Sequence, residues 1–295
     1  MSLRVGITLG DPAGIGPEII RAALDSKRLP AQAEYRLIGQ SFDGVAGKPS
    51  PETARAAAAA LEEAAALAGA GELDAIVTGP IHKAGIYEIG FKFPGQTEFF
   101  AERSGTTNFA MLLTGGSLTV ALTTAHIPLR DVPGALRQSE IVRVGLLLLD
   151  FLKARSGDAP RIAVAGLNPH AGESGKIGRE EIEIIEPAVV ELAAAAGGTA
   201  TVQGPVSPDT VFHRAVVGEF DAVLCMYHDQ ALIPLKLHSF HSGVNVTLGL
   251  PFPRTSPDHG TAFNIAGRGI ARPDSMIAAI NLAVELAHVR KGRAG

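Results

Sequence analysis

Short apolar runs alternate along the chain with turns and with longer stretches of helical pattern. The runs are three to six residues long, which is the length of a strand rather than of a helix. The clearest strand candidates are residues 5–9, 35–38, 75–77, 118–123, 161–165 and 222–226. Most are followed by Gly, Pro or Asn and then by a helical stretch. We therefore predict an α/β fold with a largely parallel sheet.

Two stretches have the strongest helical pattern. Residues 51–69 are rich in alanine, and a Pro-Glu pair at the start and Gly69 at the end suit the two ends of a helix. Residues 178–198 carry four glutamates early, where negative charge favours the positive end of the helix dipole. Residues 41–50 form the most linker-like stretch.

Composition excludes several classes of protein. The 295 residues are 46% apolar, which suits one large α/β unit or two lobes. The formal net charge is -4, so no basic excess favours nucleic acid. No 18 apolar residues run uninterrupted, and the first residues do not resemble a signal peptide. The single cysteine, Cys225, lies in an apolar run and cannot close a disulfide within the chain. We expect a buried thiol, no membrane association and a cytoplasmic protein.

Three histidines follow predicted strands in the same way. His126, His170 and His228 come after the runs 118–123, 161–165 and 222–226. The carboxyl ends of strands are where open α/β sheets bind ligands, and three neutral imidazoles suit a divalent transition metal. Each histidine alone is also compatible with a structural role. His82 follows a fourth run and is a competing ligand.

Two glycine-rich stretches do not match nucleotide-binding motifs. GDPAGIGPEII follows the first strand, but its glycines do not form G-x-G-x-x-G. It can bind an anion through its amides or serve as a tight structural turn. AGESGKIG lacks the spacing and the Ser/Thr of a Walker A loop.

Longer strings carry a family resemblance. MYHDQALIPLK and GVNVTLGLPFPRTSPDHGTAFNIAGRG closely resemble the 4-hydroxythreonine-4-phosphate dehydrogenase (PdxA) family, as do GDPAGIGPE, VTGPIHK, TEFFAERSG, LNPHAGE and GPVSPDT, all in the same order. The resemblance implies an isocitrate/isopropylmalate dehydrogenase-like fold with two α/β lobes around a central cleft. It also implies a homodimer whose subunits share each active site. We expect residues 1–95 with 239–295 in a first, cofactor-side lobe and residues 96–238 in a second, metal-side lobe.

The resemblance also assigns site residues. The family's metal ligands fall on His126, His170 and His228, for zinc, magnesium or cobalt. Its substrate contacts fall on Gln96, Thr97, Lys236, Asn245 and Arg254, which suit a phosphate or carboxylate. The loop DHGTAFNIAGRG resembles the one that binds the adenosine end of NAD in the wider superfamily, with contacts at Gly260, Thr261, Ala262 and Asn264. Because Asn264 is uncharged, NAD is expected with NADP as an alternative.

The implied reaction is a metal-assisted hydride transfer. The 3-hydroxyl of 4-hydroxythreonine-4-phosphate, a small phosphorylated hydroxy acid, would be oxidised by NAD, and the 3-keto acid would then lose carbon dioxide, in pyridoxal phosphate biosynthesis. Asp229 and Asp209 are candidate proton-handling or ligand-orienting carboxylates, and Lys83 is a candidate general base. Asp209 is equally suited to a helix cap or turn.

The sequence departs from the family at one informative position. Family members usually read G-H-T-E-F where this chain reads GQTEF, so Gln96 stands in place of a substrate-contacting histidine. The chain is also shorter near residues 41–50. Both departures concern the substrate rather than the reaction. Alternatives are therefore a paralogue acting on 4-phosphoerythronate, 4-phosphothreonate or an aromatic dihydrodiol, a redox-silent metal hydrolase, or a ligand-binding protein without turnover.

Overall fold

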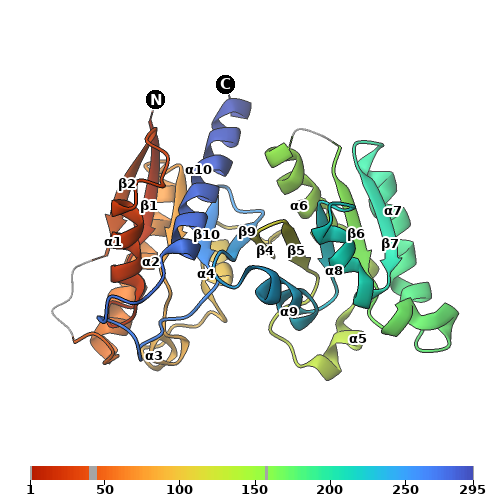
Figure 1. The fold of residues 1–295 in the computed structure, drawn as a ribbon, viewed down its shortest axis with the longest axis horizontal. Helices are drawn as coiled ribbons and strands as arrows, with labels where there is room; N and C mark the ends of the chain where they lie inside the picture. The colour runs from red at the N-terminus through yellow and green to blue at the C-terminus, as the bar shows by residue number, and fades with distance from the viewer. Residues whose placement is uncertain (1, 40–44, 157–158, 295) are drawn as a thin grey trace. The chain divides into compact units, whose positions relative to one another are not determined.

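The computed structural model describes residues 2–39, 45–156 and 159–294. The chain forms two compact units (Figure 1). Unit 1 consists of Met1–Thr107 and His241–Gly295, and unit 2 of Asn108–Phe240. The sequence-based boundaries were drawn after residues 95 and 238. The linker-like stretch 41–50 lies partly outside the described residues. No described helix has both the length and the apolar character needed to cross a lipid bilayer.

Unit 1 is built on five strands in the order β2-β1-β3-β10-β9. They are β1 (Leu3–Thr8), β2 (Ala33–Ile38), β3 (Ala75–Thr78), β9 (Val244–Leu248) and β10 (Arg254–Pro257). All neighbouring pairs are parallel except β9 with β10. Every residue of β3 is buried, as expected for a central strand that is covered on both faces.

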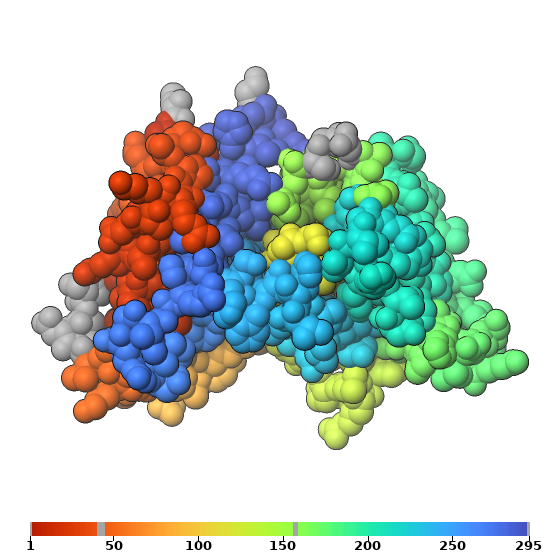
Figure 2. Space-filling view, viewed as in Figure 1, coloured from red at the N-terminus to blue at the C-terminus, as the bar shows by residue number. Residues whose placement is uncertain are grey.

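The described residues of unit 1 form the helices α1 (Gly16–Asp25), α2 (Pro51–Gly69), α3 (Lys83–Glu88), α4 (Gln96–Arg103) and α10 (Asp274–Ala294). Helix α2 has the predicted bounds, because Ser50 and Thr53 form a reciprocal capping box at its start. Its buried alanines pack with α4 in one apolar cluster. Helix α10 packs on β1, β3, β9 and β10 and against α1. Figure 2 shows α10, in dark blue, beside the red N-terminal segment.

Unit 2 is also built on a mostly parallel sheet, with the strand order β4-β5-β8-β6-β7. The strands are β4 (Ala110–Gly115), β5 (Leu118–Leu122), β6 (Arg161–Ala165), β7 (Thr201–Val206) and β8 (Ala222–Cys225). β5, β8, β6 and β7 are parallel to their neighbours in this order. Their carboxyl ends therefore meet at one edge of the sheet, where His126, His170 and His228 follow.

Helices α6 (Gln138–Ser156), α7 (Glu186–Ala196), α8 (Pro208–Val216) and α9 (His228–Ser239) pack on this sheet. The short helix α5 (Val132–Ala135) contacts mainly the 3-10 turn Leu129–Asp131. The predicted helix at 178–198 divides into a π-helical turn, Glu181–Ile185, and α7. Cys225 is fully buried in the core beneath α8 and α9, which confirms the sequence-based expectation. Burial raises the pKa of its thiol.

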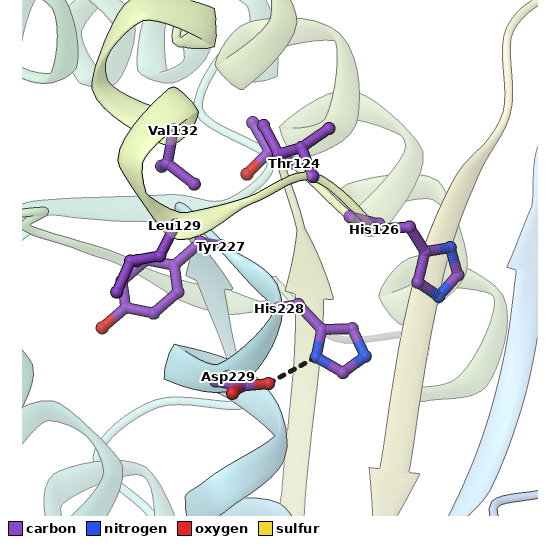
Figure 3. A pocket seen from close by; sticks show the side chains of 9 residues that line it. Thr124, His126, Leu129, Val132, Tyr227, His228 and Asp229 are labelled. Atoms are coloured by element: carbon purple, nitrogen blue, oxygen red, sulfur yellow. Dashed lines mark hydrogen bonds and ion pairs between the residues drawn. The ribbon is translucent and has the colours of Figure 1, made fainter.

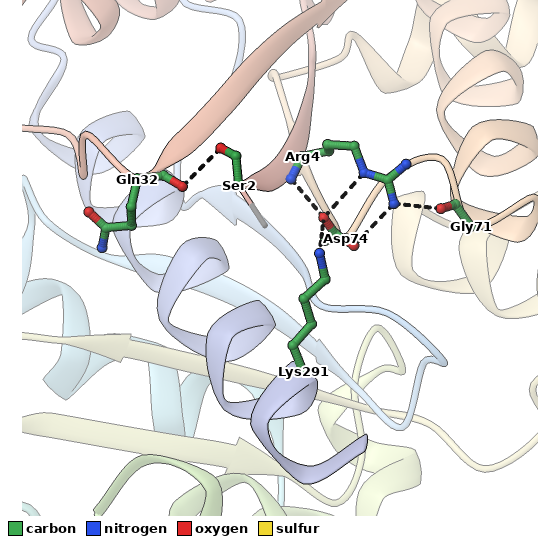
Figure 4. A network of polar contacts seen from close by, with 6 residues as sticks. All are labelled: Ser2, Arg4, Gln32, Gly71, Asp74 and Lys291. Atoms are coloured by element: carbon green, nitrogen blue, oxygen red, sulfur yellow. Dashed lines mark hydrogen bonds and ion pairs between the residues drawn. The ribbon is translucent and has the colours of Figure 1, made fainter. Parts of the chain in front are cut away.

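A half-buried carboxylate, that of Asp74, connects residues near the two ends of unit 1 (Figure 4). Asp74, which precedes β3, accepts hydrogen bonds from the Arg4 backbone at 2.7 Å and from Lys291 Nζ at 2.8 Å. Arg4 also donates to the Gly71 carbonyl at 2.7 Å. Burial raises the pKa of Asp74, but the hydrogen bonds from Lys291 and Arg4 outweigh this effect, so the net pKa is lowered.

We expect Asp74→Asn to lower the free energy of unfolding by about 2 kcal/mol at pH 7, because charge-assisted hydrogen bonds are lost. The pKa of Asp74 is lower in the folded than in the unfolded chain. Its contribution is therefore present above its unfolded pKa and is lost as the pH falls through its folded pKa. Urea unfolding of both proteins across acid pH measures this difference. Glu72→Gln, which changes the same charge in an exposed pair with Arg36, is the control and should cost under about 0.5 kcal/mol.

Candidate functional site

Two of the three strand-end histidines lie beside each other in unit 2 (Figure 3). The rings of His126 and His228 have centroids 5.6 Å apart and planes inclined at 42°. They border a pocket whose lining residues include Thr124, Leu129, Val132, Tyr227 and Asp229. His228 begins α9, and its Nδ1 lies 2.6 Å from Asp229 Oδ1. A carboxylate on Nδ1 fixes the ring and directs Nε2 outward, as is usual for a histidine that binds a metal.

The third histidine lies on an unusual turn. Residues 170–174 all have positive φ angles between 46° and 79°, although only Gly172 is a glycine. Left-handed backbone is unfavourable for residues with a Cβ, so this turn must be held by its surroundings. His126 also has a positive φ, 49°. Two of the three predicted ligands thus depend on strained backbone.

Asp209, in the first turn of α8, faces this turn. Its Oδ2 lies 4.0 Å from His170 Nδ1, and its Oδ1 accepts a hydrogen bond from Ser207 Oγ at 2.5 Å. The hydrogen bond from Ser207 is the main cause that lowers the pKa of the Asp209 carboxyl, and the electrostatic interaction with His170 acts in the same direction. The sequence leaves open whether Asp209 acts on a neighbouring group or serves as a turn residue. The structure contains a contact of each kind, the approach to His170 and the hydrogen bond from Ser207.

The three histidines do not form a closed metal site within one chain. Among the described residues, no group of three His, Cys, Asp or Glu side chains has the geometry to hold a metal ion. The paired His126 and His228, with Asp229 orienting the second ring, still have the donor chemistry that a divalent metal needs. The complete ligand set therefore stays a prediction.

In unit 1, a buried arginine is the centre of a second polar group. Arg254, the first residue of β10, is only 3% exposed. Its Nη2 donates to Thr78 Oγ1 at 2.5 Å and to Gln96 Oε1 at 2.8 Å, and its Nη1 donates to Thr247 Oγ1 at 3.3 Å. Burial lowers the pKa of the guanidinium to about 10, and the charge of Glu98 opposes this effect. Arg254 is therefore a cation at neutral pH.

Several polar atoms around Arg254 are buried without a hydrogen-bond partner. They are Arg254 Nε, Asn245 Oδ1 and Glu98 Oε2. Buried polar groups are normally paired, so unpaired ones next to a buried cation indicate a place for a polar ligand. Thr97, which is 3.2 Å from Thr247 through their hydroxyls, belongs to the same group. The structure thus brings Gln96, Thr97 and Arg254 together. Asn245 lies two residues from Thr247 on β9, and Lys236 lies on α9 in unit 2.

The amide of Gln96 is already engaged by protein groups. Its Oε1 accepts from Arg254, and its Nε2 donates to the Gly79 carbonyl at 3.2 Å. Gln96 therefore orients the guanidinium from one side, while Thr78 and Thr247 do so from the others. Neither threonine is predicted from the sequence as a site residue, because both come from strands that are distant along the chain.

The predicted cofactor loop lies against the first glycine-rich turn. The Ile15 amide donates to the Thr261 carbonyl at 2.9 Å, and Ala262 has a positive φ of 43°. In the turn itself, the amides of Ala13 and Gly14 bond to Asp11. Because these amides have protein acceptors, GDPAG serves as a structural turn rather than as an anion site. The predicted contacts Gly260 and Asn264 lie on the same loop.

Two further sequence-based candidates, Lys83 and His82, belong to unit 1. Lys83 is exposed at the start of α3, and its role as a general base stays a prediction. His82, the competing metal ligand, caps α3 by accepting from the Gly85 amide at 3.3 Å and contacts the Phe263 ring edge-on. These contacts give His82 a structural role.

Comparisons with known proteins agree with the site chemistry. The family model for the pyridoxal phosphate biosynthetic protein PdxA matches residues 18–283. A 4-hydroxythreonine-4-phosphate dehydrogenase from Caulobacter vibrioides is 44% identical, with 98% of each chain covered. The solved structure of a 4-hydroxythreonine-4-phosphate dehydrogenase from Klebsiella pneumoniae has a TM-score of 0.80 at 38% identity, covering 97% of this chain and 100% of that one.

A terephthalate 1,2-cis-dihydrodioldehydrogenase from Burkholderia xenovorans LB400 is more distant, with a TM-score of 0.69 at 26% identity and coverage of 97% of this chain and 98% of that one. Together these matches place the chain among the dehydrogenases of this α/β fold, and they confirm the predicted fold class. More narrowly, the chain belongs to the PdxA family of pyridoxal phosphate biosynthetic proteins.

We expect Arg254→Met to change the free energy of unfolding of the ligand-free protein by less than about 1 kcal/mol, or to raise it. The buried guanidinium bears a desolvation cost and leaves Nε unpaired, so its removal offsets the lost bonds to Thr78, Gln96 and Thr247. Urea unfolding at pH 7 without ligand measures the change. A loss of several kcal/mol would show that Arg254 holds the fold together rather than a ligand. Arg103→Met, which breaks the ion pair with Glu62, is a matched control.

Proposed function

We propose that this protein oxidises the 3-hydroxyl of 4-hydroxythreonine-4-phosphate with NAD and a divalent metal, and that decarboxylation of the 3-keto acid follows, in pyridoxal phosphate biosynthesis. The observation that supports it best is the buried Arg254 with an unpaired Nε among unpaired polar atoms, in a chain of the PdxA family. The proposed compartment is the cytoplasm.

The substrate's anionic groups fit the polar group of unit 1. A guanidinium offers a planar fork that matches the oxygens of a phosphate or carboxylate. Arg254 is held rigidly by three acceptors, so little side-chain entropy is lost on binding. Thr97 and Asn245 can add neutral hydrogen bonds, and the family resemblance assigns Lys236, a point charge, to the substrate as well.

The metal is assigned to His126, His170 and His228, and zinc, magnesium and cobalt are the candidates. When bound, such a metal lowers the pKa of a coordinated hydroxyl and stabilises the resulting negative charge. The protein supplies orientation: Asp229 holds Nδ1 of His228, and Asp209 lies close to Nδ1 of His170. Both carboxylates are also placed to accept a proton released near these histidines.

The nicotinamide cofactor is assigned to the loop with Gly260, Thr261, Ala262 and Asn264. Backbone amides and carbonyls of this loop are the recognition groups, because the loop lacks a Rossmann motif. The exposed Asn264 is uncharged and therefore does not attract a 2'-phosphate, which favours NAD over NADP. NAD held by this loop would supply the hydride acceptor of the reaction.

A homodimer is part of the proposal. Helix α9 carries the exposed apolar residues Ile233 and Leu237 one turn apart, and Leu237 is 89% exposed. Exposed apolar side chains that line up on a helix are typical of a surface that binds another protein. A second copy would complete a metal site whose three histidines do not meet within one chain.

Gln96 supports a second candidate substrate. In the family a histidine usually stands at this position, and an amide carries neither a positive charge nor a proton. A paralogue that oxidises 4-phosphoerythronate or 4-phosphothreonate would use the same metal, cofactor and Arg254. An aromatic dihydrodiol offers fewer anionic groups that a buried cation can bind than the phosphorylated acids do. A redox-silent hydrolase would use the same histidines without the cofactor loop.

The proposal is tested by NADH formation at 340 nm from 4-hydroxythreonine-4-phosphate, with the purified protein, before and after removal of divalent metal by a chelator. We expect metal-dependent turnover at about 1–100 per second, restored by added zinc, magnesium or cobalt. The matched controls are NADP in place of NAD, and the two phosphorylated sugar acids in place of the substrate.

Each outcome of these measurements supports one of the candidate functions. NADH formation only from 4-phosphoerythronate or 4-phosphothreonate would change the proposed substrate and leave the proposed reaction unchanged. Metal-dependent release of phosphate without NADH would favour the hydrolase. Absence of turnover with every substrate, despite bound NAD, would contradict an enzymatic role.

We expect His170→Ala to abolish metal-dependent NADH formation and leave the fold intact. His170 is exposed on its turn, so its removal creates no cavity. Circular dichroism and the thermal midpoint check the fold, and the NADH assay checks the activity. His213→Ala on α8 is the control, because His213 is not a predicted ligand. Wild-type turnover by His170→Ala would exclude His170 from the metal site.

A further inference from the structure

A buried glutamine connects two of the strand ends that carry the histidines. Gln230 lies in the first turn of α9, two residues after His228, and is only 7% exposed. Its Oε1 accepts a hydrogen bond from the Met226 amide at 2.7 Å, and its Nε2 donates to the Gly166 carbonyl at 2.7 Å. Met226 follows β8 and Gly166 follows β6. One side chain therefore fixes both strand ends through their backbones.

The same strand end is bonded to the strand that carries His126. Thr124 Oγ1 donates to the Met226 carbonyl at 2.7 Å, and the Thr124 amide also donates to this carbonyl at 3.2 Å. The Met226 carbonyl thus accepts hydrogen bonds from Thr124, which follows β5, and the Met226 amide donates one to Gln230. The ends of β5, β8 and β6 form one continuous hydrogen-bonded series.

A buried glutamate continues the series to the left-handed turn. Glu181, on the π-helical turn, is 2% exposed. Its Oε1 accepts from the amides of Leu167 and Asn168, both at 2.7 Å, and its Oε2 accepts from Asn168 Nδ2 at 2.9 Å. The Asn168 carbonyl in turn accepts from the Ala171 amide at 3.1 Å. Glu181 therefore anchors the segment that leads into His170.

These bonds explain how an unfavourable turn persists. The left-handed residues 170–174 cannot be maintained by their own preferences, because four of the five have a Cβ. The segment has little space to relax: a Cβ on Gly172 would lie 2.7 Å from Glu181 Oε2, and one on Gly178 would lie 2.3 Å from Asn168 Nδ2. Close packing and the Glu181 bonds together fix the backbone at His170.

We propose that Gln230 and Glu181 are positioning residues that set the metal-ligand histidines: Gln230 fixes the strand ends of His170 and His228 relative to each other, and Glu181 fixes the turn of His170. This inference rests on the proposed metal function. If a site takes its histidines from two subunits, each subunit contributes one of these strand ends to each site, so the bonds of Gln230 within a subunit bear on both sites. The hydrogen bonds of Gln230 and Glu181 described above involve no histidine ring. Both residues therefore act on the histidines through the backbone.

The first test uses Gln230→Met, which keeps the length of the side chain and removes both hydrogen bonds. Cobalt(II) is titrated into the metal-free, full-length wild-type and variant proteins, well below their thermal midpoints. We expect the affinity for cobalt to fall about 10- to 100-fold, which is the usual effect of losing a partner that orients ligands. The visible absorption of bound cobalt, which depends on the number and arrangement of its ligands, should change as well.

Thr114→Val is the matched control in the same unit. The Thr114 and Thr119 hydroxyls form a buried bond of 2.9 Å at the hairpin end of β5, opposite the histidine edge. This variant loses a buried hydrogen bond and some stability, but its cobalt affinity and spectrum should equal those of the wild type. A general loss of stability is thereby separated from a loss of positioning.

A second readout needs no metal. Hydrogen exchange of the metal-free protein should become at least about 10-fold faster at the amides of 166–175 in Glu181→Gln, since a carboxamide places a donor where the carboxylate accepts. In Gln230→Met the increase should extend to 226–229. Exchange in β4 and β5 should remain at the wild-type rate in both variants.

The two readouts distinguish this inference from the proposed function. If the wild type binds cobalt and both variants bind it with unchanged affinity and spectrum, the positioning role is overturned and the metal site is kept. If the wild type binds no cobalt, the metal site is overturned, and the positioning role falls with it. Unchanged exchange at 166–175 in both variants would also contradict the role of these two side chains.

Discussion

The carboxyl ends of parallel strands leave backbone amides and carbonyls that no further strand pairing can satisfy. In unit 2 these groups are buried, and buried polar groups must find partners. Gln230 and Glu181 are those partners for Met226, Gly166, Leu167 and Asn168. The requirement to satisfy the strand ends thus also determines where the following residues lie. The positions of the histidines depend on this constraint, because each follows one of these ends by a few residues.

In unit 1, by contrast, the buried polar group around Arg254 is only partly paired. Arg254 is a cation inside an apolar core, next to the ring of Phe100 at 5.8 Å, and several atoms around it have no partner. Burying a charge without full pairing costs stability, so the arrangement is unfavourable for folding alone. The left-handed turn at His170 is likewise unfavourable, by about 1–2 kcal/mol for each residue with a Cβ. Unfavourable features of both kinds concentrate at functional sites, where ligand binding offsets their cost.

The sequence predicted much of this framework, for identifiable reasons. Helix α2 was predicted to the residue, because proline, alanine and glycine act locally at its ends and centre. The strands before the histidines were found because they are short, apolar and buried. Four strands were missed. β7 and β10, with TVQGPV and RTSP, contain polar residues, glycine or proline in place of an apolar run, whereas β4 and β9, with AMLLTG and VNVTL, are largely apolar and were missed all the same. The pattern identifies a strand by its apolar residues, and a strand that carries a site residue such as Arg254 lacks them.

The remaining features of the site depend on topology. Thr78, Thr247 and Arg254 come together because β3, β10 and β9 are neighbours, an order that no local pattern contains. The left-handed turn has one glycine in five residues, so its sequence does not predict positive φ angles. The role of Gln230 was equally hidden, because its partners are backbone atoms and carry no sequence signal.

Gln96 shows how a substitution in the site can leave the reaction class unchanged. Its amide presents an acceptor to Arg254 and a donor to the Gly79 carbonyl at the same time. A neutral imidazole can also present one acceptor and one donor, but it loses the acceptor when it is protonated near pH 6.5. The orientation of Arg254 in this chain is therefore independent of pH across the physiological range. The amide adds no positive charge, so a bound anion is neutralised by Arg254 alone within this polar group of unit 1. We therefore expect Gln96 to bear on the choice of substrate rather than on the proposed chemistry at the histidines.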